Sequence, residues 1–338
     1  MDKAKNLKLL AIVFTVWLMW LAQNHLDAYS LRILITIAIF IILSTSYNLI
    51  NGVTGQLSLE PNGFVAVGAY VTALLLIGSE AKLDMYQLED PSPWILVANT
   101  SLLPALFMSG VISSILALCL AFPVFRVRGD YLAIVTLGFG FIIRVYAVNT
   151  PEVTNGSIGL NDIPSSINLY WAGGLAITTV LIMLNIVYSK YGRSMKAVRD
   201  DEDAASAMGI STFKIKTYSF MTSAFFEGVG GGLLAVFLTT ISPDLFTFFL
   251  TFQLIIIIVL GGLGSMSGAI IGTFLVIGGG EWLRVLDEEV NFFGLHVDAH
   301  PGMRMVVFSL ILIAVMLFAR EGVMGKREFS ELFKRGKK

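Results

Sequence analysis

The chain has 338 residues, of which 56% are hydrophobic and 14% are charged, and its mean hydropathy is +0.78. Soluble domains carry about 25% charged residues, so this composition excludes an ordinary soluble protein and indicates a membrane protein. The formal net charge of −1 argues neither for nor against nucleic-acid binding. From the membrane-type composition we expect the lipid bilayer as a partner, and we expect no nucleic-acid partner.

Apolar segments recur along the whole chain. A helix needs about 20 apolar residues to span a bilayer, and these runs do not alternate in polarity as barrel strands would. The first run has a basic start but no small-x-small cleavage site after it, so we interpret it as an uncleaved span. The sequence predicts an all-α polytopic protein with about ten transmembrane helices, in a range of about eight to ten. The expected spans cover residues 7–23, 31–50, 62–78, 101–123, 131–148, 171–189, 217–240, 244–260, 266–286 and 303–319.

Lys and Arg divide unequally between the two sides of the predicted bundle. With both chain ends in the cytoplasm, 18 of the 23 Lys and Arg lie inside and five lie at outer positions. Positive residues favour the cytoplasmic side, so we expect this orientation. It gives one transmembrane domain over residues 1–320 and a basic cytoplasmic tail over 321–338. It also requires a turn between two crossings, near the cytoplasmic face, at Gly261-Gly262-Leu263-Gly264-Ser265.

Residues 190–216, here called the island, form a charged stretch between two spans and hold six of the 23 Lys and Arg. Ser194 is expected to cap a helix that ends near Met208, with Gly209 as its stop. One side of this helix is apolar and comprises Met195, Val198, Ala205 and Met208. Two pairs of opposite charges lie at i,i+4 spacing, Lys196 with Asp200 and Arg199 with Asp203. Each such pair stabilises a helix by roughly 0.2–0.5 kcal/mol, which is too little to explain the charge density. The island is either a solvated connector or a docking surface.

Polar residues interrupt the apolar pattern in two places. Thr54-Gly55 and Pro61 should break helical geometry inside the segment 48–62, which contains no Lys or Arg. Glu227 lies in the middle of the span 217–240. Polar groups within spans are costly, which makes them candidates for function. The candidate substrate-pathway residues are Asn48, Gln56, Ser58, Glu60, Asn62 and Glu227.

Each of these features also has a simpler interpretation. The segment 48–62 could equally be an ordinary polar turn between two spans. For Glu227 we favour a buried hydrogen bond to another helix or subunit over contact with substrate. Gly228 and Gly232, four residues apart, favour close helix packing over a gating role. Cys119 lies in an apolar run and is expected to be a small buried side chain.

The residues Asp203-Ala204-Ala205-Ser206-Ala207-Met208-Gly209 resemble the Glu-Ala-Ala-x-x-x-Gly loop of ABC importer permeases. In that family the loop forms a short coupling helix that sits in a cleft of the ATPase subunit. This chain has Asp in place of Glu and lacks the usual downstream Leu-Pro. The resemblance implies contact with an ATPase through Arg199, Glu202, Asp203, Ala204, Ala205 and Gly209.

Further motifs follow one another in an order similar to one branch of that family, the branched-chain amino acid ABC transporter permeases of the LivM type. The resemblance covers roughly residues 30–320. The chain departs from it at Glu60-Pro61-Asn62, where the family usually has Gly, then His or Gln, then a small residue. This departure bears on substrate identity more than on the class of transporter. The motifs are Tyr47 to Leu59, Gly63-Phe64, Gly68-Ala69-Tyr70, Arg128 to Gly138, Ser242-Pro243-Asp244 and Val259 to Ser265.

The resemblance implies the ABC importer permease fold and a transport subunit rather than an enzyme. Its partners would be a second homologous permease, two ABC ATPases and a periplasmic binding protein, in a bacterial inner membrane. The chain has no G-x-x-x-x-G-K-[ST] loop, so ATP and Mg²⁺ are expected on the ATPases, and no cofactor or metal on this chain. Branched-chain amino acids are the first expected cargo, with urea, short amides or aromatic acids as alternatives. A self-sufficient secondary transporter or channel is the rival interpretation.

Overall fold

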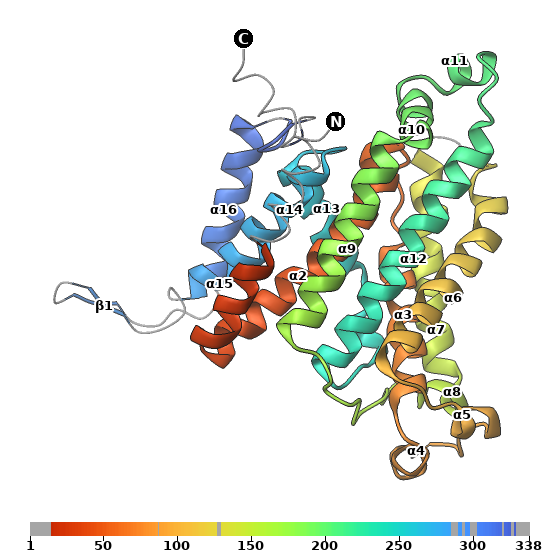
Figure 1. Cartoon of the computed structure of the whole chain (residues 1–338), viewed down its shortest axis with the longest axis vertical. Helices are drawn as coiled ribbons and strands as arrows, with labels where there is room; N and C mark the ends of the chain where they lie inside the picture. Colours follow the sequence, from red (N-terminus) through yellow and green to blue (C-terminus); the bar gives the residue numbers. More distant parts are fainter. Residues whose placement is uncertain are drawn as a thin grey trace.

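The computed structural model describes residues 15–86, 88–126, 130–284, 290–292, 295–297, 303–319, 321–325 and 328. Long helices run side by side through most of this part of the chain (Figure 1). The start of the first expected span, Arg128-Gly129 of one family motif, and most of the tail 321–338 lie outside the described residues.

The helices follow in chain order, after a described helical stretch at residues 15–25. The first group is α2 (Ala28–Asn48), the π-helix η1 (Leu49–Val53), α3 (Pro61–Leu76), α4 (Ser79–Met85), α5 (Pro93–Val97), α6 (Leu102–Val124), α7 (Asp130–Asn149), α8 (Pro151–Thr154) and α9 (Leu169–Tyr188). The second group is α10 (Lys190–Asp200), α11 (Glu202–Ala207), α12 (Thr212–Leu238), the 3-10 helix η2 (Pro243–Leu245), α13 (Phe248–Gly261), α14 (Met266–Thr273), the π-helix η3 (Phe274–Gly278), α15 (Gly279–Trp282) and α16 (Met303–Phe318).

The predicted class, a helical membrane protein, is confirmed. Among the described residues six helical segments are long and apolar enough to cross a membrane, and a seventh is possible if α3 and α4, bent by 117°, form one span. The six are Ala28–Val53, Leu102–Val124, Tyr131–Asn149, Leu169–Tyr188, Thr212–Leu238 and Pro243–Gly261. The larger number of about ten stays a prediction, because α14 to α15 and α16 are shorter than the segments expected there.

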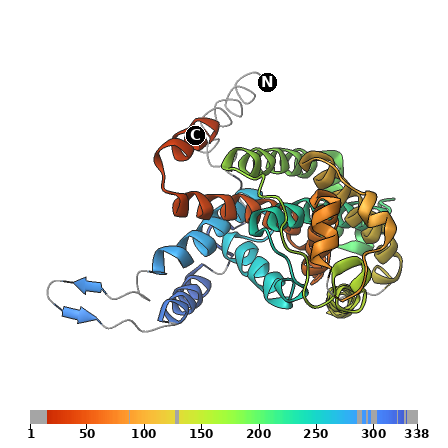
Figure 2. The same ribbon diagram turned by 90° about the horizontal axis from the view of Figure 1, so that it is seen from below.

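One short hairpin departs from the all-α expectation. Strand β1 (Val290–Phe292) pairs antiparallel with β2 (Leu295–Val297), with Asn291 opposite His296. It extends away from the helices (Figure 2). Three-residue strands make a connection between helices rather than a sheet with its own core.

Small residues allow α3, α6 and α12 to pack at very short range; we call these three helices the closed cluster. A Cβ placed on Gly68 of α3 would lie 2.0 Å from the carbonyl oxygen of Gly228 in α12, and one on Gly231 would lie 2.1 Å from the Val65 oxygen. Ser109 of α6 donates to the same Gly228 oxygen, at 3.2 Å. The predicted packing role of the glycines is therefore confirmed. Cys119 is exposed, on the face of α6 away from this packing, so the expectation that it is buried was wrong.

The two ends of the bundle differ. At the island end, α9 leads into α10 and α11, which extend beyond the bundle (Figure 1). At the opposite end, α4, α5 and α8 seal the bundle, and buried Lys82 donates from Nζ to the Ile95 and Ala98 oxygens at 2.8 and 2.7 Å. The hydroxyl of Tyr86 donates to the Val153 oxygen at 2.5 Å. The opposite end is thus held by side-chain hydrogen bonds to loop carbonyls.

Candidate functional site

The break that the sequence predicted after α2 is present. Helix α2 widens into η1, where Thr54 N–H bonds the Leu49 oxygen five residues earlier, at 3.1 Å. Gly55 then takes a left-handed conformation, φ +73°, which favours glycine. The chain reverses, and Pro61 begins α3 at a position where its missing N–H costs nothing. Single π turns inside helices often occur at functional sites.

The polar residues of this break face inward. Asn48, Ser58, Glu60 and Asn62 are all buried, whereas Gln56 is partly exposed. Tyr47 donates to the Ser58 oxygen at 2.5 Å and Asn51 accepts from Ser58 N–H at 2.8 Å, which closes the loop on itself. None of these residues lines either of the two cavities described below. Their role in a substrate path stays a prediction.

Glu60 and Glu227 are two fully buried carboxyl groups. Glu227 bonds Ser223 of its own helix at 2.8 Å, and Ser223 also lies 2.7 Å from the Ser46 oxygen of α2. The second oxygen of Glu227 and both oxygens of Glu60 have no hydrogen-bond partner among the described residues. A buried carboxyl group in this state must be neutral or bind a cation or water. The link from Glu227 to another helix therefore runs through Ser223.

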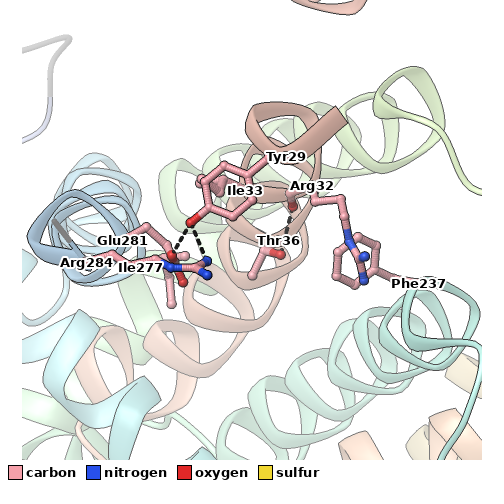
Figure 3. A pocket seen from close by; sticks show the side chains of 8 residues that line it. All are labelled: Tyr29, Arg32, Ile33, Thr36, Phe237, Ile277, Glu281 and Arg284. Atoms are coloured by element: carbon pink, nitrogen blue, oxygen red, sulfur yellow. Dashed lines mark hydrogen bonds between the residues drawn. The ribbon is translucent and has the colours of Figure 1, made fainter. Parts of the chain in front are cut away.

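A cavity of about 390 Å³ opens between the start of α2, the end of α12 and α15. Figure 3 shows the Tyr29 hydroxyl pointing toward Glu281 and Arg284 on one side, and Arg32 beside Phe237 on the other. Tyr29 donates to Glu281 Oε2 at 2.7 Å and accepts from Arg284 Nη1 at 2.9 Å. We call this the charged cavity. It lies far from the island, because α2 begins here and ends at the island end.

A second cavity of about 460 Å³ adjoins the first and shares Thr36, Ile277 and Glu281 with it. It is mostly apolar and lies between α2, α13, η3 with α15, and α16; we call it the aromatic cavity. Gln253 adds a polar group to its wall. The aromatic lining residues are Phe40, Phe249, Phe252 and Phe308.

The sequence reasoning missed both cavities. Arg32 and Arg284 entered it only as charges at the outer ends of spans, and Glu281 did not enter it at all. A usable signal was present, since two Arg and one Glu occur at the same end of two separate spans. Only the packing of α2 beside α15 reveals that these charges face one cavity.

The island differs from the single helix predicted for residues 194–208. Asp201 ends α10 and caps α11 by accepting from Asp203 and Ala204 N–H at 3.0 and 2.9 Å, so the chain breaks there. Ser189, not Ser194, caps α10. An aspartate that can accept two N–H groups favours a cap over a helix interior, which explains the break.

The apolar face of the island is only partly as predicted. Met195, Val198 and Ala205 are buried, but Met208 is 83% exposed at the tip. Gly209 ends the segment as predicted, in a left-handed conformation with φ +84°. Among the charges, Glu202 pairs with Lys216 at 2.7 Å, and Arg199 pairs with Asp200 at 2.9 Å. Lys196 lies over the Tyr188 ring instead of pairing with Asp200 as predicted.

The island touches the break directly. Arg199 Nη1 lies 3.4 Å from the Gly52 oxygen of η1, and a Cβ on Gly55 would meet the Arg199 side chain at 2.3 Å. Asn48 holds the predicted glycine turn between α13 and α14, donating to the Ser265 oxygen at 2.9 Å and accepting from Gly264 N–H at 3.0 Å. The island, the break and the glycine turn therefore form one junction at the island end.

The C-terminal segment reaches the same junction. Val323 and Met324 N–H bond the oxygens of Leu260 and Gly261 at 2.8 and 3.0 Å. The Glu328 carboxylate accepts from Met266 and Ser267 N–H at the start of α14, at 2.6 and 3.0 Å. An anion at a helix start satisfies N–H groups that otherwise lack partners. The C-terminal segment thus lies at the same end of the bundle as the island.

Comparison with known proteins identifies this arrangement. A family model described as "Branched-chain amino acid transport system / permease component" matches residues 29–316. The chain belongs to this family. Its relatives include the high-affinity branched-chain amino acid permease proteins LivM of Salmonella typhimurium and of Escherichia coli K12, each 30% identical over 82% of this chain and 68% of the relative. LivH of Escherichia coli K12 is 25% identical over 87% of this chain and 93% of its own length. No solved structure matches the chain.

Membership in the branched-chain permease family confirms the predicted resemblance and places the chain among transport permeases rather than enzymes. The matched residues include the break after α2, the island and the glycine turn. Both LivM and LivH proteins are similar to the chain, which is consistent with a pair of related permeases.

Proposed function

We propose that the chain is one of the two transmembrane subunits of an ATP-driven ABC importer for branched-chain amino acids. The observation that carries this proposal is the island, because α10 and α11 extend beyond the bundle and present an exposed Met208 next to Gly209. An apolar tip surrounded by charged residues is suited to insertion into a partner protein. The family match to residues 29–316 supports an amino acid as cargo.

In this proposal the island end faces the cytoplasm of a bacterial cell and the whole chain lies in the inner membrane. The excess of Lys and Arg on that side and the C-terminal segment beside the island both favour this orientation. Residues 1–320 form the permease domain and residues 321–338 a basic cytoplasmic tail. A LivH-like permease completes the pathway, and a periplasmic binding protein delivers the amino acid.

Two ATPase subunits bind ATP and Mg²⁺ and act on the island. The residues in the coupling role are Arg199, Glu202, Asp203, Ala204, Ala205 and Gly209. Arg199 is suited to transmit movement, because its side chain packs on Gly55 and reaches the Gly52 oxygen. A displacement of α10 would then act on the break after α2.

The test is ATP-driven uptake of L-leucine by the reconstituted importer. Replacing Gly209 by Val strains a left-handed position, and replacing Glu202 and Asp203 together by Lys reverses the charge of α11 and breaks the pair with Lys216. We expect both variants to insert normally but to lose most ATPase stimulation and uptake. Normal uptake in both would refute the docking role, and uptake by the chain without ATPases would refute the importer.

A further inference from the structure

We propose that the side of the bundle that borders the aromatic cavity is the surface against which the LivH-like permease packs in the membrane. This surface, here called the α13 face, comprises α13 and the segment from η3 to α15 around the mouth of the cavity. The inference rests on the proposed function, which requires a second permease, and it adds which face of this chain meets that permease.

Gln253 lies near the middle of a membrane span and has an amide group without a hydrogen bond. The span covers Pro243–Gly261. The side chain lines the aromatic cavity, the residue is partly exposed, and it forms no hydrogen bond with any residue that the structure describes. Hydrocarbon offers an amide neither a donor nor an acceptor, so contact with lipid at this depth is unfavourable. A polar group on a neighbouring transmembrane helix would supply the missing hydrogen bond.

The aromatic cavity opens beside Gln253 toward the outside of the bundle. Phe249 and Phe252 line it and yet are 81% and 50% exposed, so the described part of the chain does not enclose the cavity. Helices in a folded protein pack closely, and an unfilled space of about 460 Å³ loses the dispersion contacts that side chains of another helix would supply. The shape of the α13 face therefore matches the side chains of a packed partner.

The face on the opposite side of the bundle has a different composition. Helices α6 and α7 lie there, across the bundle from α16 (Figures 1 and 2). Helix α6 contains no charged or amide residue, and those of α7 lie in its first turn or its last two turns. The exposed side chains along the two helices are mainly apolar, as lipid requires; they include Phe107, Ile115, Phe122, Ile134, Ile142 and Val145.

The exposed face of α9 does not repeat the arrangement around Gln253. Thr178 donates to the Gly174 oxygen of its own helix at 2.8 Å. Asn185 is exposed, but it lies in the last turn of α9 beside the island, at the edge of the membrane. Among the six described spans, Gln253 is therefore the amide in the middle of a span that needs a partner from outside the chain.

Depth in the membrane decides which of the proposed partners can cover the α13 face. The ATPases act on the cytoplasmic side and the binding protein acts on the outer side, so neither reaches the middle of a span. The second permease does reach it. The chain is similar to both LivM and LivH proteins, which favours a related but different permease over a second copy of this chain.

The experiment places the photo-crosslinking residue p-benzoylphenylalanine at one position at a time in the importer reconstituted in nanodiscs. Phe249 and Phe252 test the α13 face, and Phe107 and Ile142, which are 60% and 66% exposed on α6 and α7, are the matched controls. Mass spectrometry identifies the cross-linked molecule. We expect the first two positions to cross-link the LivH-like permease and the two controls to cross-link lipid.

A substitution tests the role of the amide. Gln253→Leu should weaken the association of the two permeases roughly threefold, since one interhelical hydrogen bond in the membrane is lost. Asn185→Leu, an identical change of residue class at the edge of α9, should leave the association unchanged. Native mass spectrometry of the diluted complex measures the fraction of paired permeases.

Several outcomes would overturn the assignment of the α13 face. They are cross-linking from Phe249 and Phe252 to lipid alone, to a second copy of this chain or to nothing, and cross-linking of the LivH-like permease from Phe107 or Ile142. Equal association in Gln253→Leu and the wild type would remove the amide from the interface. Failure of the two permeases to copurify would instead refute the proposed function, and the α13 face with it.

Discussion

Carboxyl groups occur in two regions of the bundle that are packed differently. One region is the closed cluster of α3, α6 and α12, and the other is the side of the bundle formed by α2, α13 and α15. In the closed cluster, glycines bring backbones into contact, and Glu60 and Glu227 are buried with no hydrogen-bonding partner for three of their four oxygens among the described residues. On the other side the helices leave two cavities, and Glu281 lines both of them. A carboxyl group in a span is thus no guide to a ligand site unless the packing around it leaves space.

Two π-helices occur among the described residues, η1 directly after α2 and η3 directly after α14. The segment η1 leads into the closed cluster and touches the island through Arg199. The segment η3 contributes Ile277 to both cavities. One irregular turn therefore lies beside the proposed ATPase contact and the other beside the two cavities.

The largest effect should come from filling the closest contact of the closed cluster. In Gly68→Leu the new side chain has no space, because even a Cβ would lie 2.0 Å from the Gly228 oxygen. Overpacking costs about 1–3 kcal/mol where neighbours can move, and a backbone neighbour can move least. We expect loss of folded protein, measured by membrane yield and size-exclusion chromatography.

Gly174→Leu in α9 is the control, because a Cβ there meets nothing within 4 Å. We expect it to fold at wild-type yield. Equal yields for the two variants would show that the helices of the closed cluster can move apart more easily than their close contacts indicate. The difference in packing between the two regions would then be contradicted.

A smaller effect should distinguish the two kinds of carboxyl group. Glu281→Gln removes the charged acceptor of the Tyr29 hydrogen bond beside Arg284 and should lower the melting temperature of the permease, since a hydrogen bond to a charged group is lost. Glu227→Gln keeps the shape and the acceptor for Ser223, so KM should stay unchanged. Thermal unfolding checks the first substitution, and uptake kinetics of the reconstituted importer check the second. A raised KM in Glu227→Gln would support the prediction that Glu227 lies in the substrate path.

The sequence predicts the helical class, the break at Gly55 and Pro61, and the glycine turn well, because each depends on local chemistry that a short segment carries. It misplaces the cap of α10, because Ser189 and Ser194 are equivalent as residue types and only the end of α9 selects the first. It also misses the cavities, since Arg32 and Glu281 are about 250 positions apart and meet only through helix packing. Short sequence patterns do not show how segments far apart in the chain pack together.

The smallest effect concerns the loops that seal the closed cluster at the end opposite the island. Tyr86 donates to the Val153 oxygen at 2.5 Å, and burial raises the pKa of Tyr86 from 10.0 to about 12. Tyr86→Phe removes this hydrogen bond and should lower the free energy of unfolding by about 1 kcal/mol at neutral pH. The decrease should appear as a lower melting temperature, with uptake retained.

The effect of this substitution should also depend on pH. Because the pKa of Tyr86 is higher in the folded protein than in the unfolded chain, its contribution is fully present below pH 10 and is lost as the pH rises toward about 12. The difference in melting temperature between wild type and Tyr86→Phe should therefore shrink across that window. Subtracting the two curves removes the titration of Lys and other tyrosines, which both proteins share. A difference that stays constant to the highest pH would mean that the Tyr86 hydroxyl does not bond the Val153 oxygen. The loops at this end would then be packed less tightly than the closed cluster that they cover.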